Sequence, residues 1–468
     1  MKKSLFSSLL LLCFCVATSA QTIERLTTEY MQTPVGIDVK QPQFGWQMKS
    51  DRYGAEQKAY RLVVSDSEDN LNRGNYVYDS GKTNSGLSVG IKYAGAALKP
   101  ATRYYWRVTV TDEKKKEIDS PVSWFETGLL GSQWDNAQWI SSPRTQVSPY
   151  RSDFVLEYDV KNEGKPGPST FVYGAKGADS YCYITIDTRK PARLVAGAVL
   201  YKKKVEYQNI DISNIITSQA LTNHHVRMVV HGGGDYNLQI QIDGKQVKSK
   251  EGKNDFGVNC MRDSVGRSDC HLYDIGYVQQ LGFDAQFSGI SVSDTKWDVL
   301  LASDSKTYNA EGNGKLNTWT FNEEINAPMM RNVVNIAKKV KSARLYATAR
   351  GFYNFYINGK KAGDAYMAPG WTDFRHRIMY DTYDVTSMLT DGKNALTIEL
   401  GNGWFCSNWG WTGSGWSDQY GFKPSAMAML KVTYEDGSSE SFVTNRDWKV
   451  SDNGPLFVDN LYHGVIYD

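Results

Sequence analysis

The sequence predicts an all-β protein built from three β-sandwich domains. Short stretches such as residues 57–65 and 103–110 alternate apolar with polar side chains, as strands with one buried face do. Clusters of Gly, Asn, Asp and Ser separate these stretches at short intervals, and helical periodicity is absent from the sequence. A chain of 468 residues is long enough for roughly three domains, each with a core of its own.

The first 20 residues have the pattern of a secretory signal peptide. Lys2 and Lys3 precede an apolar run at residues 5–17, and small residues follow at positions 18–20, which predicts cleavage before Gln21. We therefore expect the mature chain to be secreted or periplasmic. No later apolar run reaches the length of a membrane span.

The charge of the mature chain is balanced. Removing two lysines from 53 basic residues leaves 51, which equals the 51 acidic residues. A chain with no net charge has no electrostatic feature that points to nucleic acid or to a membrane surface as a partner. The expected ligand is therefore uncharged.

The expected strands fall into three groups along the chain. Residues 22–129 have the short, turn-punctuated strands of an immunoglobulin or fibronectin type III sandwich. Residues 150–296 have longer strands and more polar loops, which favour an inserted jelly roll. Residues 297–468 form the third sandwich, and residues 130–149 are a candidate for its start. The polar stretch from residue 297 to the mid-320s is expected to be a linker.

Two tight hairpins are expected from their turn residues. The sequences IDGK at 242–245 and INGK at 357–360 place Asp-Gly and Asn-Gly between strands. These pairs accept the positive φ angles that a two-residue hairpin turn requires.

Four cysteines remain after signal cleavage: Cys182, Cys260, Cys270 and Cys406. Cys260 and Cys270 enclose a short polar loop, and a bridge between them would stabilise the fold by about 2–3 kcal/mol through loop closure. Because Cys182 is also available, the pairing stays open. Buried free thiols are the alternative interpretation.

Motifs in the third region occur together and in order: GFYNFYINGKKAGD, APGWTDFRHRIMYDTYDVTSML, GKNALTIELGNGW and YGFKPSAMAMLKVTYEDGS. Through them this region resembles the N-terminal β-sandwich of bacterial α-L-rhamnosidases of glycoside hydrolase family 78. The first region is similar to the fibronectin-like module that begins such proteins, through TPVGID, PQFGWQM and WFETGLL. The middle region is similar to carbohydrate-binding module family 67.

The resemblance implies a substrate-recognition and scaffolding portion of a secreted α-L-rhamnosidase, with a rhamnose-containing glycan as ligand. In this family the chemistry belongs to a following (α/α)6 barrel, which we expect to be absent from this chain. The barrel would then be a missing partner, in cis or in trans. Two alternatives stay open: an autonomous rhamnose-binding, lectin-like protein, and a small hydrolase that is active by itself.

Three carboxylates, Asp373, Glu399 and Asp418, are the candidates for catalysis. An inverting glycosidase needs an acid and a base about 6.5–9.5 Å apart across the sugar. Each candidate has an ordinary structural interpretation: an Asx hydrogen bond in a turn for Asp373, the exposed face of a strand for Glu399, and a loop for Asp418. We predict no catalytic residue in this chain.

Asp179 and Ser180 are the candidates for sugar and metal binding in the middle region. In the similar module, an acidic residue and its neighbour lie near a calcium ion that bridges to rhamnose hydroxyls. The resemblance therefore implies Ca²⁺ as a cofactor, with Asp179 as a metal ligand. Ca²⁺ accepts six to eight oxygens, sugar hydroxyls among them. The alternative is that Asp179 only caps a turn.

Residues 401–416 combine glycines with four tryptophans. Indole rings stack on the apolar C–H faces of sugars, so this stretch predicts carbohydrate binding by Trp409, Trp411 and Trp416. The alternative is that the rings cover a seam with the barrel, where glycines allow close backbone approach. We favour the seam for Trp404.

Overall fold

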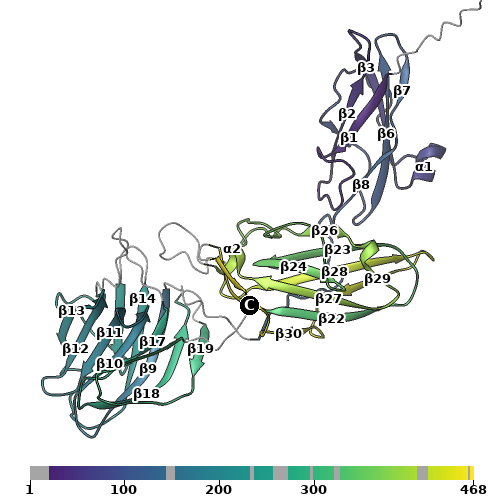
Figure 1. Ribbon diagram of the computed structural model, residues 1–468. Coiled ribbons are helices and arrows are strands. Elements are labelled where there is room, and N and C mark those ends of the chain that lie inside the picture. Colours follow the sequence, from purple (N-terminus) through teal and green to yellow (C-terminus); the bar gives the residue numbers. More distant parts are fainter. Residues whose placement is uncertain are drawn as a thin grey trace, which may run out of the picture. The chain divides into compact units, whose positions relative to one another are not determined.

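The computed structural model describes residues 21–143, 153–231, 237–256, 272–295, 299–320, 327–407, 420–461 and 464–467. These residues form antiparallel sheets (Figure 1), with two short α-helices among them, α1 (Glu68–Arg73) and α2 (Gly403–Cys406). The prediction of an all-β fold is confirmed. The described residues contain no helix that is long and apolar enough to cross a membrane. The predicted signal peptide lies outside the described residues.

The first sandwich packs a three-stranded sheet against a five-stranded one. The smaller sheet has the order β1 (Thr22–Thr28), β2 (Gln43–Lys49), β5 (Ile91–Lys92). The larger sheet has the order β4 (Tyr78–Asp79), β3 (Gln57–Ser65), β6 (Arg103–Asp112), β7 (Glu117–Asp119), with β8 (Ser123–Glu126) also on β6. Phe44 of β2 meets Trp106 of β6 at a ring distance of 4.8 Å, so aromatic side chains fill the space between the two sheets.

The middle sandwich has two larger sheets around one core. Six strands follow the order β13 (Lys203–Asp211), β12 (Arg193–Leu200), β11 (Ser180–Asp187), β10 (Pro168–Ala175), β17 (Asp274–Val278), β21 (Leu316–Thr320). Seven strands form the other sheet, in the order β16 (Lys245–Gln246), β15 (Asn237–Ile242), β14 (His224–His231), β9 (Asp153–Glu163), β18 (Asp284–Ser293), β19 (Leu300–Asp304), with β20 (Tyr308–Ala310) also on β18. Tyr158 stacks on Phe171 across the core, with ring centroids 4.1 Å apart.

The expectation of a linker from residue 297 to the mid-320s is wrong for residues 299–320. β19, β20 and β21 lie in this stretch, and they pair with strands of the middle sandwich. Apolar side chains of this stretch pack against one another: Trp319 stacks on Tyr308 with ring centroids 4.1 Å apart. The polar composition of this stretch gives no strand pattern, because these strands are stabilised by pairing with neighbouring strands rather than by their own sequence.

The third sandwich packs a five-stranded sheet against a four-stranded one. The first has the order β25 (Lys360–Lys361), β24 (Phe352–Ile357), β27 (Gly392–Gly401), β22 (Met329–Ile336), β30 (Lys449–Ser451). The second has the order β26 (Asp381–Asp384), β23 (Val340–Arg350), β28 (Ser425–Tyr434), β29 (Ser439–Val443). A 3-10 turn, η1 (Thr386–Met388), and a hairpin of β31 (Leu456–Asn460) with β32 (Gly464–Tyr467) complete it.

Residues 138–141 also belong to the third sandwich. The Gln138 amide donates to the Thr444 carbonyl at 2.8 Å, and Ile140 forms a two-way bridge with Ala426. The chain therefore contributes a short segment to this sandwich before it forms the middle one.

Both expected hairpin turns have the backbone that their residues favour. Asp243 and Gly244 have φ angles of +50° and +74°, and Asn358 and Gly359 have +52° and +78°. Positive φ at both central residues is the geometry of a type I′ turn, so these two predictions are confirmed.

Cys182 is buried and disulfide-bonded, whereas Cys406 is a buried thiol outside any disulfide. The free-thiol interpretation is therefore wrong for Cys182. Cys260 and Cys270 lie outside the described residues, so the choice of partner stays open.

A candidate binding pocket in the third sandwich

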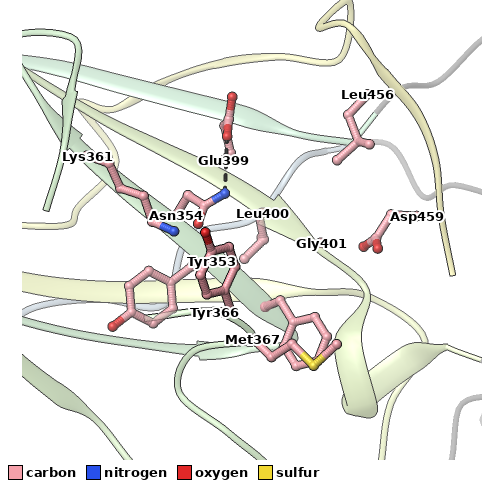
Figure 2. Close-up of a pocket in the computed structure, with 11 residues that line it drawn as sticks. Tyr353, Asn354, Lys361, Tyr366, Met367, Glu399, Leu400, Gly401, Leu456 and Asp459 are labelled. Atoms are coloured by element: carbon pink, nitrogen blue, oxygen red, sulfur yellow. Dashed lines mark hydrogen bonds between the residues drawn. The ribbon is translucent and has the colours of Figure 1, made fainter. Parts of the chain in front are cut away.

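A pocket of about 240 Å³ lies where β24 and β27 run side by side in the third sandwich. Figure 2 shows Asn354 and Glu399 on this strand pair, with Lys361 and Tyr366 on one side and Leu456 and Asp459 on the other. Four separate parts of the chain therefore meet at one cavity.

Strand register brings the first two polar groups together. Asn354 of β24 is the direct partner of Glu399 of β27, and side chains of directly opposed residues lie on the same face of a sheet. The Asn354 amide donates to Glu399 Oε2 at 3.4 Å, and the Tyr356 hydroxyl donates to the same oxygen at 2.7 Å. Among the described residues, Glu399 Oε1 receives no hydrogen bond.

Tyr356 keeps its proton across the physiological range. Burial, and then the hydrogen bond to Glu399, raises the pKa of Tyr356 to about 12. The phenol therefore acts as a donor that fixes one carboxylate oxygen of Glu399 and leaves the other available.

The second carboxylate comes from the C-terminal hairpin. Asp459 of β31 accepts a hydrogen bond from the Asn402 amide at Oδ2, and the Asn402 side chain donates to the Asp459 carbonyl at 3.2 Å. This approach requires glycine at 401, because a Cβ atom there would lie 2.2 Å from Asp459 Oδ2. Burial raises the pKa of Asp459. Asp459 thus holds the hairpin against the end of β27.

The rim of the pocket is apolar and open to solvent. Lys361 Nζ donates to the Ala365 carbonyl at 2.9 Å and lies 5.0 Å from the centre of the Tyr366 ring. Tyr366 is 89% exposed and Met367 is 59% exposed. A cation over the ring restrains it, so one aromatic face stays available at the entrance.

The structure supports the turn interpretation of Asp373 and places Glu399 in the pocket. Arg375 donates to both oxygens of the Asp373 carboxylate at 2.8 Å, and these bonds lower the pKa of Asp373 to about 2. The Arg375 amide makes the expected Asx hydrogen bond at 3.1 Å. Asp418 lies outside the described residues.

Asp179 of the middle sandwich lies beside a lysine. Its carboxylate is 3.7 Å from Lys202 Nζ, and its carbonyl accepts the Lys202 amide. Ser180 starts β11 and pairs with Leu200. The described residues contain no group of three His, Cys, Asp or Glu side chains that could hold a metal. One carboxylate that lies beside an ammonium does not make up a calcium shell, and calcium binding at Asp179 stays a prediction.

The tryptophans predicted to bind carbohydrate, Trp409, Trp411 and Trp416, lie outside the described residues. Trp404 stacks on Trp371 with ring centroids 5.3 Å apart and an interplanar angle of 24°. Trp404 thus packs within an aromatic cluster of the third sandwich itself.

Sequence reasoning missed Asp459, Lys361 and Tyr366 as members of one site. Asp459 and Asn402 are 57 residues apart, and no local pattern joins them. The pairing of Asn354 with Glu399 follows from the register of β24 on β27, whereas the INGK turn joins β24 to β25 and sets only that register.

Comparisons with known proteins identify the two outer regions. Residues 23–131 match the Rha78A-like N-terminal immunoglobulin domain, and residues 338–468 match the alpha-L-rhamnosidase N-terminal domain. The resemblance of these regions to the N-terminal part of rhamnosidases is therefore confirmed, while the fibronectin-like character of the first region stays a prediction. The likeness of the middle region to a carbohydrate-binding module stays a prediction.

Full-length proteins that are similar to this chain are named alpha-L-rhamnosidase. An alpha-L-rhamnosidase of Streptomyces avermitilis is 32% identical over 481 residues, which cover 96% of this chain and 43% of the relative. One from Formosa agariphila is 25% identical, over 100% of this chain and 34% of the relative. The chain thus spans less than half the length of either relative.

A solved structure agrees. That of the Streptomyces avermitilis alpha-L-rhamnosidase complexed with L-rhamnose superposes with a TM-score of 0.58 at 27% identity, over 96% of this chain and 43% of the other. By sequence and by fold, this chain is similar to the N-terminal portion of α-L-rhamnosidases.

Proposed function

We propose that this chain recognises rhamnose-containing glycans and scaffolds catalysis as the N-terminal portion of a secreted α-L-rhamnosidase. The observation that carries the proposal is the match to α-L-rhamnosidases over 96% of the chain, one of which has been solved with L-rhamnose. Secretion is inferred from the pattern of residues 1–20.

Among the carboxylates that were candidates for catalysis, Asp373 has a contact that argues against a role in hydrolysis. Asp373 is held by Arg375, Glu399 by Tyr356, and Asp459 by Asn402. An inverting glycosidase needs one protonated carboxylic acid and one free base on opposite sides of the sugar. The pKa of Asp373 is held low by Arg375, which makes it unsuitable as the acid.

The test separates activity from recognition. We expect the purified mature chain to release no product from an aryl α-L-rhamnoside. We also expect it to raise the activity of the separately expressed catalytic part of a relative on a rhamnose-containing glycan. If the chain alone hydrolyses the rhamnoside, and Asp373→Asn or Glu399→Gln abolishes this activity, the proposal that the chain recognises the glycan without hydrolysing it is wrong. Sugar binding without any effect on a catalytic partner would favour the lectin-like alternative.

A further inference from the structure

We propose that the pocket of the third sandwich binds one neutral 6-deoxyhexose ring of the glycan. This site would be separate from the one predicted at Asp179 in the middle sandwich. The identity of the sugar rests on the proposed function, whereas the need for a small, uncharged polyol with one apolar end rests on the pocket.

The size of the pocket selects a single ring. Cavities that take drug-sized ligands have volumes of about 300–1,000 Å³, and this one has about 240 Å³. The exposed rim at Tyr366 leaves an open side. A terminal sugar, or one ring of a chain that continues into solvent, fits these limits.

The polar groups suit vicinal hydroxyls. Glu399 Oε2 is occupied by Tyr356 and Asn354, while Oε1 is available to accept a hydrogen bond from a ligand hydroxyl. Hydrogen bonds to a carboxylate are stronger than those between neutral groups. Lys361 uses one N–H on the Ala365 carbonyl, and an ammonium has three. Acceptors and donors therefore both face the cavity, as a polyol requires.

The charges disfavour an ionic ligand. The ammonium of Lys361 offsets the carboxylate of Glu399 across the same cavity. Asp459 is engaged with Asn402, and burial raises its pKa. The pocket therefore has no excess of positive charge for an anion and no excess of negative charge for a cation.

The apolar groups suit the methyl end of a 6-deoxy sugar. Met367 and Leu456 line the pocket, and Tyr366 offers its ring at the rim. A ring C–H face can lie on Tyr366, and a C6 methyl can lie against Met367 or Leu456. A hydroxyl on C6 would lose part of its hydration and would gain no hydrogen-bond partner from Met367 or Leu456. L-Rhamnose and L-mannose differ only at this position, so the pair tests the assignment.

The experiment reads the pocket through Met367. The mature chain is labelled with [13C-methyl]methionine, the Met367 signal is assigned with Met367→Leu, and L-rhamnose and L-mannose are titrated. We expect the Met367 signal to shift with L-rhamnose at a Kd near 1 mM, about −4 kcal/mol. We expect L-mannose to bind about tenfold more weakly, because apolar pockets discriminate only modestly against an added hydroxyl.

Two variants test the contacts, and one serves as a matched control. Glu399→Gln and Tyr366→Ala should each weaken the Met367 response about tenfold, and Tyr366 is exposed enough for its loss to leave the fold intact. Glu440→Gln is the control, because Glu440 accepts the Tyr434 hydroxyl at 2.7 Å as Glu399 accepts that of Tyr356. It should leave the titration unchanged, and melting curves report folding for all three.

The outcomes separate this inference from the proposed function. If L-rhamnose shifts other methionines and leaves Met367 unmoved, the pocket assignment falls while glycan recognition stands. If L-rhamnose shifts no methionine signal, the pocket assignment falls, and a calorimetric titration of the same chain decides whether it recognises this sugar at another site. If Met367 responds to an added catalytic domain but not to sugar, the pocket is a protein-docking surface and the assignment is overturned.

Discussion

At position 459 a carboxylate is mostly buried against the end of β27. Burial raises its pKa above the unfolded value, so the folded state holds this proton more tightly than the unfolded state does. The stabilising contribution of the group is therefore complete at low pH and is lost as the pH rises through the folded pKa. The hydrogen bond from the Asn402 amide acts in the opposite direction and lowers the pKa of this carboxyl, but the effect of burial is larger.

The substitution Asp459→Asn should consequently remove this contribution to the pH dependence of stability. Asparagine keeps an acceptor for the Asn402 amide and carries no charge to desolvate. We expect its melting temperature at pH 7 to exceed that of the unmodified chain by a few degrees, and the difference to vanish toward pH 3. Asp364→Asn, at an exposed position of the same sandwich, should change neither. A lower melting temperature for Asp459→Asn at pH 7 would show that the negative charge itself is needed.

The predicted calcium ligand, Asp179, is tested by binding. If calcium holds the sugar hydroxyls in the middle sandwich, a calorimetric titration with L-rhamnose should lose its signal from that site on addition of a chelator and equally in Asp179→Ala. The titration is carried out in Glu399→Gln, so that binding in the pocket of the third sandwich is weakened and contributes less to the signal. Lys202→Ala should strengthen calcium binding, because it removes the ammonium 3.7 Å from the carboxylate. Binding that survives both chelator and Asp179→Ala would rule out the calcium mechanism.

Among the structural elements, the hairpin of β31 and β32 packs closely on Gly401, a position without a side chain. Gly401→Ala would place a methyl group 2.2 Å from Asp459 Oδ2, so the Asp459 carboxylate must leave its present position and its hydrogen bond from the Asn402 amide. We expect a loss of about 1–3 kcal/mol in the free energy of unfolding, together with loss of the Met367 response to sugar. Gly86→Ala is the control, since its Cβ would meet only the Gln57 carbonyl at 3.4 Å. Equal melting temperatures for Gly401→Ala and Gly86→Ala would contradict this account.

Elements with a local cause are the ones that sequence predicts. The turns at Asp243-Gly244 and Asn358-Gly359 follow from the φ angles that two residues accept. The strands at 300–320 could not be found in this way, because Trp319 gains its packing from Tyr308, from Tyr277 and from the core of the middle sandwich. The pocket could be predicted only in part for the same reason. The sequence shows Glu399 as a carboxylate on a strand, but Asp459, which lines the same pocket, belongs to a distant strand.

At the scale of the whole molecule, the middle sandwich ends later than its composition indicates. β21 pairs with β17 along five residues, Leu316 to Thr320. Deleting residues 150–296 would remove β17 and leave β21 without a partner strand. Replacing residues 150–320 by a Gly-Ser linker removes the whole module.

The shorter deletion should therefore be insoluble or melt without cooperativity, whereas the longer one should leave both flanking sandwiches folded. Soluble yield and the cooperativity of thermal unfolding, measured on both proteins, decide the matter. If the two deletions behave alike, β19 to β21 do not belong to the middle sandwich as a folding unit.

The segment at residues 138–141 has a consequence for the order of assembly. Thr444, whose hydroxyl donates to the Gln138 carbonyl, follows it by 306 residues. At a synthesis rate of about 5–20 residues per second, the segment emerges about 15–60 s before its partner. The intervening middle sandwich can be complete within that time, but the third sandwich cannot close until its last strands exist. A nascent chain stalled between the two positions would therefore carry a folded module on an open sheet edge, which is the state most exposed to aggregation and to proteolysis.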